Sequence, residues 1–234
     1  MAFDPVLMIM QPRHLDESIN SLKENIDIPK AWFRAYTEPQ VVAQMNKFVR
    51  ETNFSHYIVM GDDGIVSREA ADTILKYGEM KEYDVFTGWM NMHLEKDGSY
   101  SKESTICLGW IPEFKDPEGP VRDEYPPWQS VSWVHSLPPD KVIRTAMANF
   151  AMTIAERELF LKFPLQTHKL GRASDHHWSY RLQRAGVKVY THPDAFIKHL
   201  RKGWTPWRHN WLVGNVESEI RYENMKWGNR EDYV

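Results

Sequence analysis

The chain has 234 residues, a formal net charge of −3, and 42% hydrophobic and 26% charged residues. These values are typical of a folded globular protein with one large domain or two small ones, and they exclude a wholly disordered chain. The slight acidic excess argues against a general nucleic-acid-binding protein. A single cysteine, Cys107, excludes an intramolecular disulfide and a cysteine-rich zinc site.

The sequence shows no segment that we expect to enter a membrane. Its N-terminal stretch lacks the basic start and long apolar run of a signal peptide. No stretch approaches the roughly 20 consecutive apolar residues that span a bilayer. We therefore expect a cytoplasmic protein, and peripheral contact with a membrane stays open.

The first part of the chain alternates between apolar runs and helical patterns. Residues 6–10 (VLMIM) are typical of a buried strand, and Pro12 ends that strand. Asp16 is expected to cap the helix that follows. Residues 30–36 (KAWFRAY) predict a second strand, and Pro39 begins a helix with apolar residues at helical spacing.

The alternation continues with a third strand at residues 56–60 (HYIVM) and a helix that Ser67 caps. Residues 84–89 (DVFTGW) predict a fourth strand. This order predicts a mainly parallel sheet with helices on both faces, an α/β fold. In the second half, we expect a hairpin and an ordered loop over 91–129, followed by a strand at 131–134. A long helix is expected over 141–160. A further helix is expected over 175–185, ended by Gly186, and a strand at 187–190.

Two adjacent carboxylates, Asp62 and Asp63, follow the third strand. Ligands bind beyond the carboxyl ends of strands in open parallel sheets, so these side chains are expected to face that crevice. Adjacent carboxylates repel, and a Mg²⁺ or Mn²⁺ ion shared with substrate phosphates commonly compensates for this. The alternative is a solvated turn, because Asp-Gly is a frequent turn pair.

A second cluster surrounds Asp175, which stands at the start of a predicted helix. Asp175 is expected to favour that helix start, and the same carboxylate can also act as a base. His176 and His177 follow it, but adjacent helical residues diverge by about 100°, so we expect at most one of them to be functional.

A third cluster contains His192, Pro193, Asp194 and His199. A His-x-Asp pair with a later histidine is also found in facial iron triads. Such a triad draws its last histidine from a distant strand, whereas His199 and His209 lie close by in this sequence. The residues alone therefore favour structural roles or a single metal ligand here.

In this order and spacing, the three clusters resemble family 2 glycosyltransferases and their GT-A relatives. Those proteins have an apolar strand that ends in an Asp pair before a capped helix, as at residues 57–75 here. They then carry a Glu-Asp-x-Asp motif before a helix with the pattern Leu-x-x-Arg-x-x-Arg-Ala-Gly, as at residues 174–186. A short strand, a proline and a closing histidine follow, as at Pro193 and His199. The similarity covers roughly residues 5–200.

The chain departs from this family pattern at several positions. Gly61 stands where the first metal-binding aspartate often lies, and Phe48 replaces the glycine of an Asn-x-Gly motif that begins here at Asn46. Ser174 and His177 replace the two acids that flank Asp175.

The resemblance implies a GT-A (Rossmann-like) domain over residues 1–200, a mainly parallel sheet flanked by helices, with a C-terminal extension at 201–234. It implies a nucleotide-sugar donor and a Mn²⁺ or Mg²⁺ cofactor, while the acceptor, a glycan, a lipid-linked molecule or a protein, stays unknown. The roles that it implies are metal binding by Asp63 and His199, general base catalysis with inversion by Asp175, and nucleotide binding by Pro12, Arg13, Glu38, Asp62 and Arg201.

Two other functions remain open from the sequence. A metal-dependent nucleotidyl or phosphoryl transferase would also use Asp62 and Asp63, but it would lack a base corresponding to Asp175. A degenerate GT-A domain would only bind a partner or glycan, as the lost acids around Asp175 suggest. The aromatic and basic tail, with Arg201 and Arg208, is expected either to pack on the domain or to close over the diphosphate.

Overall fold

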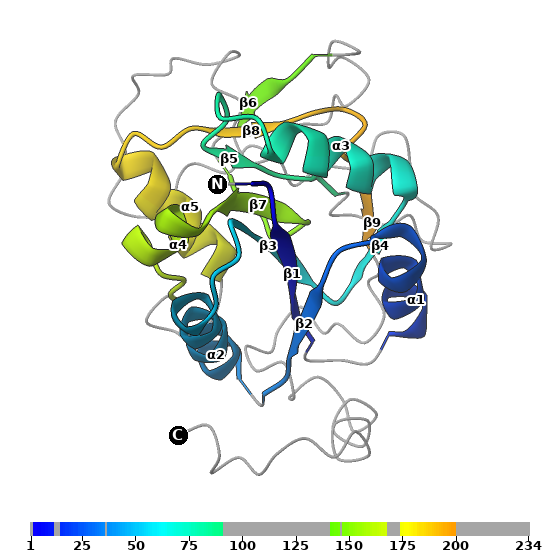
Figure 1. Ribbon diagram of the computed structural model, residues 1–234, viewed down its shortest axis with the longest axis horizontal. Coiled ribbons are helices and arrows are strands. Elements are labelled where there is room, and N and C mark those ends of the chain that lie inside the picture. Colours follow the sequence, from blue (N-terminus) through cyan, green and yellow to red (C-terminus); the bar gives the residue numbers. More distant parts are fainter. Residues whose placement is uncertain are drawn as a thin grey trace, which may run out of the picture.

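In the computed structural model of this protein, the described residues are 2–11, 15–35, 37–90, 141–145, 147–167 and 174–199. They form a mixed seven-stranded sheet and a separate two-stranded sheet (Figure 1). The seven strands are, in spatial order, β2 (Lys30–Phe33), β1 (Pro5–Met10), β3 (His56–Gly61), β7 (Thr153–Glu156), β5 (Val85–Phe86), β8 (Val189–Thr191) and β6 (Ile143–Thr145). The two-stranded sheet pairs β4 (Gly64–Val66) with β9 (Ile197–His199).

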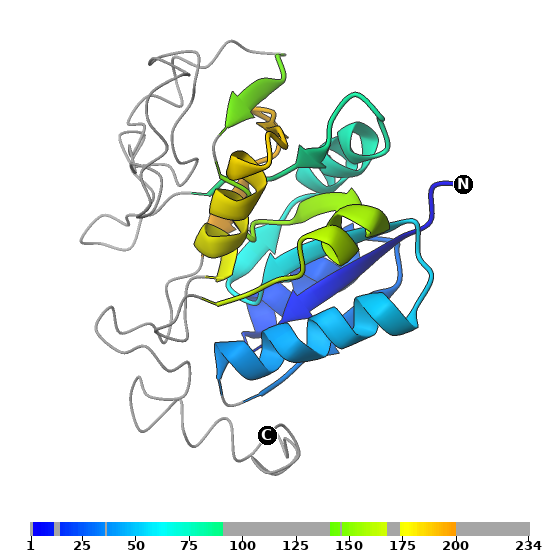
Figure 2. The ribbon, with the colours of Figure 1, turned by 90° about the vertical axis from the view of Figure 1, so that its left-hand side faces the viewer.

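The strand directions confirm the predicted mainly parallel α/β sheet. Strands β1, β2, β3, β5 and β8 share one direction, whereas β7 and β6 run against them. Helices α1 (Asp16–Asn25) and α3 (Arg68–Gly78) cover one face. The other face carries α2 (Glu38–Glu51), α4 (Arg157–Lys162) and α5 (Ser174–Arg184), as two perpendicular views show (Figures 1 and 2).

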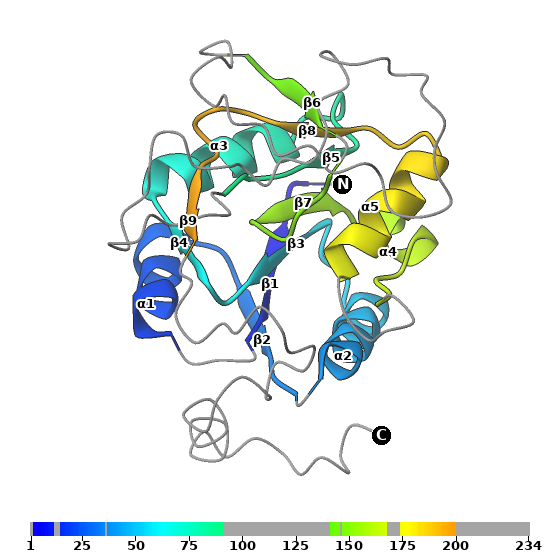
Figure 3. The same cartoon turned by 180° about the vertical axis from the view of Figure 1, so that it is seen from behind.

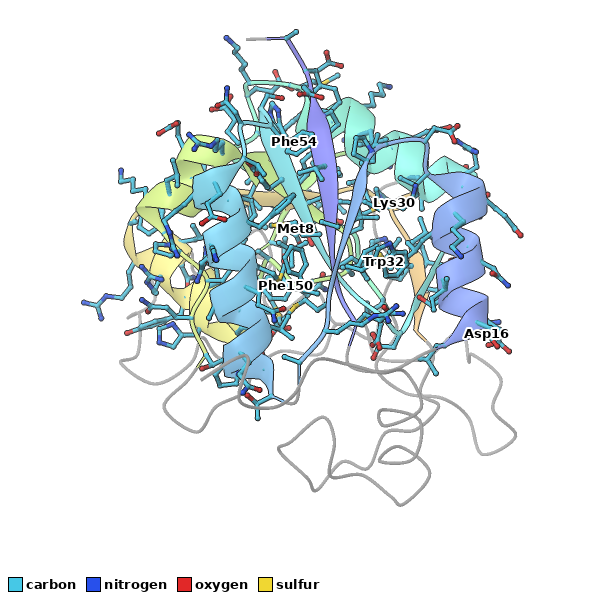
Figure 4. The ribbon with its side chains drawn as sticks, turned by 60° about the horizontal axis from the view of Figure 1, so that its bottom comes forward. Met8, Asp16, Lys30, Trp32, Phe54 and Phe150 are labelled. Atoms are coloured by element: carbon cyan, nitrogen blue, oxygen red, sulfur yellow. The ribbon has the colours of Figure 1, made fainter. Side chains whose placement is uncertain are left out.

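The central strands are apolar because they are buried on both faces. Leu7 and Ile9 of β1 contribute to the core under α1 and α3, and Met8 contributes to the core under α2, α4 and α5. Figure 4 shows Met8 and Phe150 on the α2 side and Trp32 on the α1 side. Each fully buried side chain of this size stabilises the fold by about 1.5–3 kcal/mol relative to an exposed one.

Of the three helix starts predicted at Ser67, Pro39 and Asp16, the structure confirms the first two. The Ser67 hydroxyl accepts a hydrogen bond of 3.2 Å from the backbone N–H of Ala70, as a helix cap does. Pro39 lies in the first turn of α2, as predicted. The cap predicted for Asp16 is wrong, because Leu15 holds the N-cap position and Asp16 already lies within the first turn. There its charge still complements the helix dipole.

The predicted end of α5 at Gly186 is confirmed. Gly186 has φ = +75°, a left-handed conformation that favours glycine. Its N–H donates to the Gln183 carbonyl at 3.0 Å, and the N–H of Val187 donates to the Leu182 carbonyl at 3.0 Å. This pair of bonds is the Schellman motif, which satisfies the last carbonyls of a helix.

The long helix predicted over residues 141–160 is wrong. The structure has β6, a turn, β7 and only the short α4 in this region. Strand β7 lies between β3 and β5 and is buried on both faces, so its apolar residues cannot show a strand's alternation. The turn before it is held by buried hydrogen bonds from the Thr87 hydroxyl to the Asn149 carbonyl (3.0 Å) and between Thr87 and Thr153 (2.7 Å).

Two predicted strands are shorter than expected. Strand β2 ends at Phe33, and β5 ends at Phe86, after which Trp89 forms an isolated parallel bridge with Phe196. The expected elements at 91–129 and 131–134, and the tail at 201–234, lie outside the described residues. Among the described helices, none is long and apolar enough to cross a membrane.

We predict that Gly88→Ala destabilises the protein by about 1–3 kcal/mol, the usual cost of overpacking. A Cβ at this position would lie 2.3 Å from the backbone oxygen of Ala151 and 3.1 Å from that of Ala195. Backbone atoms cannot rotate away as a side chain does. Urea unfolding measures the effect, with Gly186→Asn as the control. Asn tolerates a left-handed conformation, and no atom of the described residues lies within 4 Å of a Cβ at that position. Equal stability of the Gly88 variant and the parent would contradict this packing.

Candidate functional site

The strands β2, β1 and β3 end level with one another. Met10 of β1 pairs with Phe33 of β2 and with Gly61 of β3. All three strands run in the same direction, so their carboxyl ends form one edge of the sheet. This is the edge at which ligands bind in open α/β folds.

A polar residue follows each of these strands: Arg34, Gln11 and Asp62, which we call the strand-end row. Gln11 is 0% exposed and Asp62 is 1% exposed. The Arg34 Nε donates to the Gln11 Oε1 at 2.7 Å, which fixes the orientation of the Gln11 amide. The buried Nε2 of Gln11 therefore points its donors elsewhere, and it has no hydrogen-bond partner among the residues that the structure describes. A buried donor without a partner costs about 1–3 kcal/mol, so this group calls for a ligand or another explanation.

Asp63 lies next to the two-stranded sheet. In that sheet β4 and β9 lie side by side (Figure 3). Gly64 pairs with His199, and Val66 pairs with Ile197. The His199 backbone therefore faces Gly64, the residue after Asp63, although the two positions are far apart in the sequence. Asp63 as a residue is only 9% exposed.

Gly61 gives the Asp63 carboxylate its space. A Cβ at position 61 would lie 3.1 Å from the Asp63 Oδ1, closer than an ordinary van der Waals contact. GT-A relatives often have an aspartate at the position of Gly61, and its replacement by glycine therefore affects the neighbouring carboxylate. A side chain at Gly61 would displace the carboxylate of Asp63.

Helix α1 holds the strand that follows the two aspartates. The Ser18 hydroxyl donates to the Gly64 carbonyl at 2.7 Å. The Ser21 hydroxyl accepts from the Val66 N–H at 3.2 Å, and the Asn25 amide donates to the Val66 carbonyl at 2.8 Å. These bonds satisfy the edge of β4 that faces away from β9, so β4 is tied on both sides.

Asp175 lies in the first turn of α5 and is partly exposed. The helix is fixed at its centre by Trp178, which is fully buried and stacks on Phe160 at 4.9 Å with an interplanar angle of 13°. The Trp178 indole also donates to the Phe163 carbonyl at 2.6 Å. The position of the helix that carries Asp175 therefore depends on its packing against α4.

Glu38 makes a contact that the sequence did not indicate. Its Oε1 accepts a 2.7 Å hydrogen bond from the backbone N–H of Ser174 and a second one from the Ser174 hydroxyl. Glu38 is 7% exposed and Ser174 is 1% exposed. The residue expected at the nucleotide is thus bonded to the first residue of α5, and Ser174, which replaces a family acid, supplies both donors.

Asn46 has a structural role in this fold. Its side-chain amide donates to the Leu165 carbonyl at 2.8 Å, and its Oδ1 accepts from the Leu165 N–H at 2.9 Å. The pair ties α2 to the chain that follows α4. Asn46 therefore belongs to the scaffold of the site.

The remaining expectations can be placed only in part. Pro12, Arg13 and Arg201 lie outside the described residues. Within the part of the chain that the structure describes, no three His, Cys, Asp or Glu side chains are grouped to hold a metal. Gln11 and Arg34 were missed by the sequence analysis. The available signal was that each is the first charged or amide residue after an apolar stretch of a strand.

A cavity of about 230 Å³ lies at the other edge of the main sheet, between the ends of α3 and β7. Its lining mixes acidic and basic groups and includes His56, Glu79, Lys81, Glu156 and Lys162. Burial lowers the pKa of His56 below its ordinary value. The cavity contains none of the predicted site residues, and it is separate from the strand-end row.

Comparison with known proteins relates the chain to others through its structure. No known family and no curated protein matches the sequence. The crystal structure of GalNAc-T7, a GT-A glycosyltransferase, with UDP, GalNAc and Mn²⁺ is similar with a TM-score of 0.54 and 11% sequence identity. That match covers 98% of this chain and 49% of the other, so the chain spans about half the length of GalNAc-T7.

A second similar structure is that of A197 from STIV, with a TM-score of 0.48 and 13% identity over 88% of this chain and 98% of that chain. Its similarity is too low to support an argument. The likeness to GalNAc-T7, together with the strand order and the helices on both faces, shows that this chain has an α/β fold of the GT-A glycosyltransferase type.

Proposed function

We propose that this protein is a metal-dependent glycosyltransferase that moves a sugar from a nucleotide-sugar donor to an acceptor hydroxyl. The observation that carries the proposal is the arrangement at the carboxyl edge of the sheet. The strand-end row continues into Asp63, and the β4–β9 pairing brings the His199 backbone opposite the next residue. The presence of UDP and Mn²⁺ in the GalNAc-T7 structure supports a nucleotide-sugar and a divalent cation for this fold.

The nucleotide of the donor would lie against the strand-end row. The free Nε2 donors of Gln11 suit a carbonyl or ribose oxygen, and Arg34 adds positive charge beside them. Pro12 and Arg13 follow Gln11 directly in the chain, so they belong to the same proposed nucleotide region. A bound nucleotide would give the buried Gln11 amide an acceptor.

Asp63 and His199 would hold the divalent cation. A carboxylate with open positions for phosphate oxygens and water suits Mn²⁺ or Mg²⁺, and the imidazole would add one nitrogen ligand. Gly61 also fits this role. Because it has no side chain, nothing at position 61 crowds the Asp63 carboxylate. When bound, the cation neutralises negative charge on the diphosphate leaving group.

Asp175 would accept the proton of the attacking acceptor hydroxyl, and the transfer would invert the anomeric carbon. Its place in the first turn of α5, partly exposed, supports this role because a base must reach a substrate. Arg201 would add positive charge near the diphosphate, and the extension at 201–234 would cover the diphosphate. The acceptor remains a glycan, a lipid-linked molecule or a protein.

For the metal, we predict that Asp63→Asn abolishes Mn²⁺-dependent binding of a nucleoside diphosphate, while Asp62→Asn weakens it less. Gly61→Ala should weaken it too, because its Cβ would displace the Asp63 carboxylate. Isothermal titration calorimetry with and without Mn²⁺ measures the effect. Asp72→Asn, an exposed change on α3, is the control. Parent-like binding by the Asp63 variant would move the metal site elsewhere.

For the nucleotide, we predict that Gln11→Leu weakens nucleoside diphosphate binding about tenfold, the worth of one hydrogen bond of about 1–1.5 kcal/mol. The variant removes a buried donor that has no partner in the described part of the chain. Gln44→Leu, on α2 and partly exposed, is the matched control. Unchanged affinity in Gln11→Leu would exclude this amide from the nucleotide site.

For the base, we predict that Asp175→Asn keeps donor affinity but lowers transfer by about 10²–10⁴-fold, the usual contribution of a general base. Loss of its charge near the helix start should cost no more than about 1 kcal/mol of stability. Single-turnover transfer and thermal unfolding measure the two effects. A variant that transfers as fast as the parent would leave Asp175 only a role in stabilising the helix start.

A further inference from the structure

The first turn of α5 is held from another helix by one carboxylate. Glu38, the first residue of α2, accepts both the backbone N–H of Ser174 at 2.7 Å and the Ser174 hydroxyl. Both donors converge on the same oxygen, Oε1, and both residues are buried. The backbone and the side chain of Ser174 are therefore both fixed relative to α2.

The rest of α5 is anchored in other directions. Trp178 stacks on α4, and the Ser179 hydroxyl accepts a 2.9 Å hydrogen bond from the Ala148 N–H. These contacts hold the middle of the helix. The N–H groups of a first helical turn have no partners within the helix, so an external acceptor decides how well that turn is ordered. Glu38 supplies that acceptor one residue before Asp175.

From these contacts we infer that Glu38 is a positioning residue for Asp175 and does not act through the nucleotide. The inference rests on the proposed function, in which Asp175 is the base. Glu38 is the first residue of α2, and α2 packs on the same face of the sheet as α5. The carboxylate thereby links the start of α5, next to Asp175, to the start of α2.

This role and a nucleotide contact predict different kinetics. If Glu38 positions Asp175, Glu38→Ala lowers kcat at least tenfold, while KM for the donor and nucleoside diphosphate affinity stay within about twofold. Glu38→Gln keeps an acceptor oxygen and restores most of kcat. Ser174→Ala, a change on α5 itself, gives the same pattern to a smaller extent because its N–H bond remains.

A double-variant cycle tests the path through Asp175. In an Asp175→Asn background, Glu38→Ala should lower kcat no further, since residues that act as one unit are not additive. Hydrogen exchange should also show faster exchange of the amides of residues 174 and 175 in Glu38→Ala, with the rest of α5 unchanged. This readout does not depend on activity.

The outcomes separate the two hypotheses. If Asp175→Asn impairs transfer but Glu38→Ala does not, or if Glu38→Ala mainly raises donor KM, the positioning role is wrong and the proposed function stands. If Asp175→Asn transfers like the parent, the proposed base is wrong and the positioning role falls with it. Should Glu38→Ala fail to fold, the kcat of Ser174→Ala decides, and a parent-like value overturns the inference.

Discussion

Strand β1 pairs with β3 along its whole length and with β2 from Leu7 to Met10, and it is buried on both faces. This pairing is the constraint on which the site depends. The register ends with Met10 level with Phe33 and Gly61, so the residues that follow are delivered to one edge. A slip of one residue would exchange the side chains between two different cores, which makes the register costly to change. The positions of Arg34, Gln11 and Asp62 are thus a consequence of apolar packing.

Buried polar side chains then fix the parts that the sheet does not hold. The Ser18 hydroxyl ties β4 to α1 beside Asp63, and Glu38 ties the start of α5 to α2 beside Asp175. Each link is short, buried and made between segments far apart in the sequence. In the proposed reaction the first link supports the strand beside the metal-binding Asp63, and the second supports the helix turn that carries the base. Rigid supports of this kind are what precise placement of reacting groups requires.

Much of this fold could be predicted from the sequence because its first ninety residues follow local rules. Apolar runs, Pro39, Ser67 and Gly186 marked strands and helix ends correctly. Strand β7 was missed because a strand in the middle of a sheet shows no alternation, and its place between β3 and β5 is decided by distant partners. For the same reason the contact of Glu38 with Ser174, 136 residues away, had no local signal. The metal and base residues were expected from a resemblance, and their roles stay predictions.

The most direct test of the proposed glycosyltransferase is to incubate the purified chain with a panel of UDP-, GDP- and dTDP-sugars, with and without Mn²⁺, and to identify the released nucleotide. The account predicts that one donor class binds in the presence of Mn²⁺ and that its product is the nucleoside diphosphate, formed slowly with water and faster with a suitable acceptor. Release of pyrophosphate or a sugar phosphate would indicate a nucleotidyl or phosphoryl transferase. Absence of Mn²⁺-dependent binding across the whole panel would contradict the central claim.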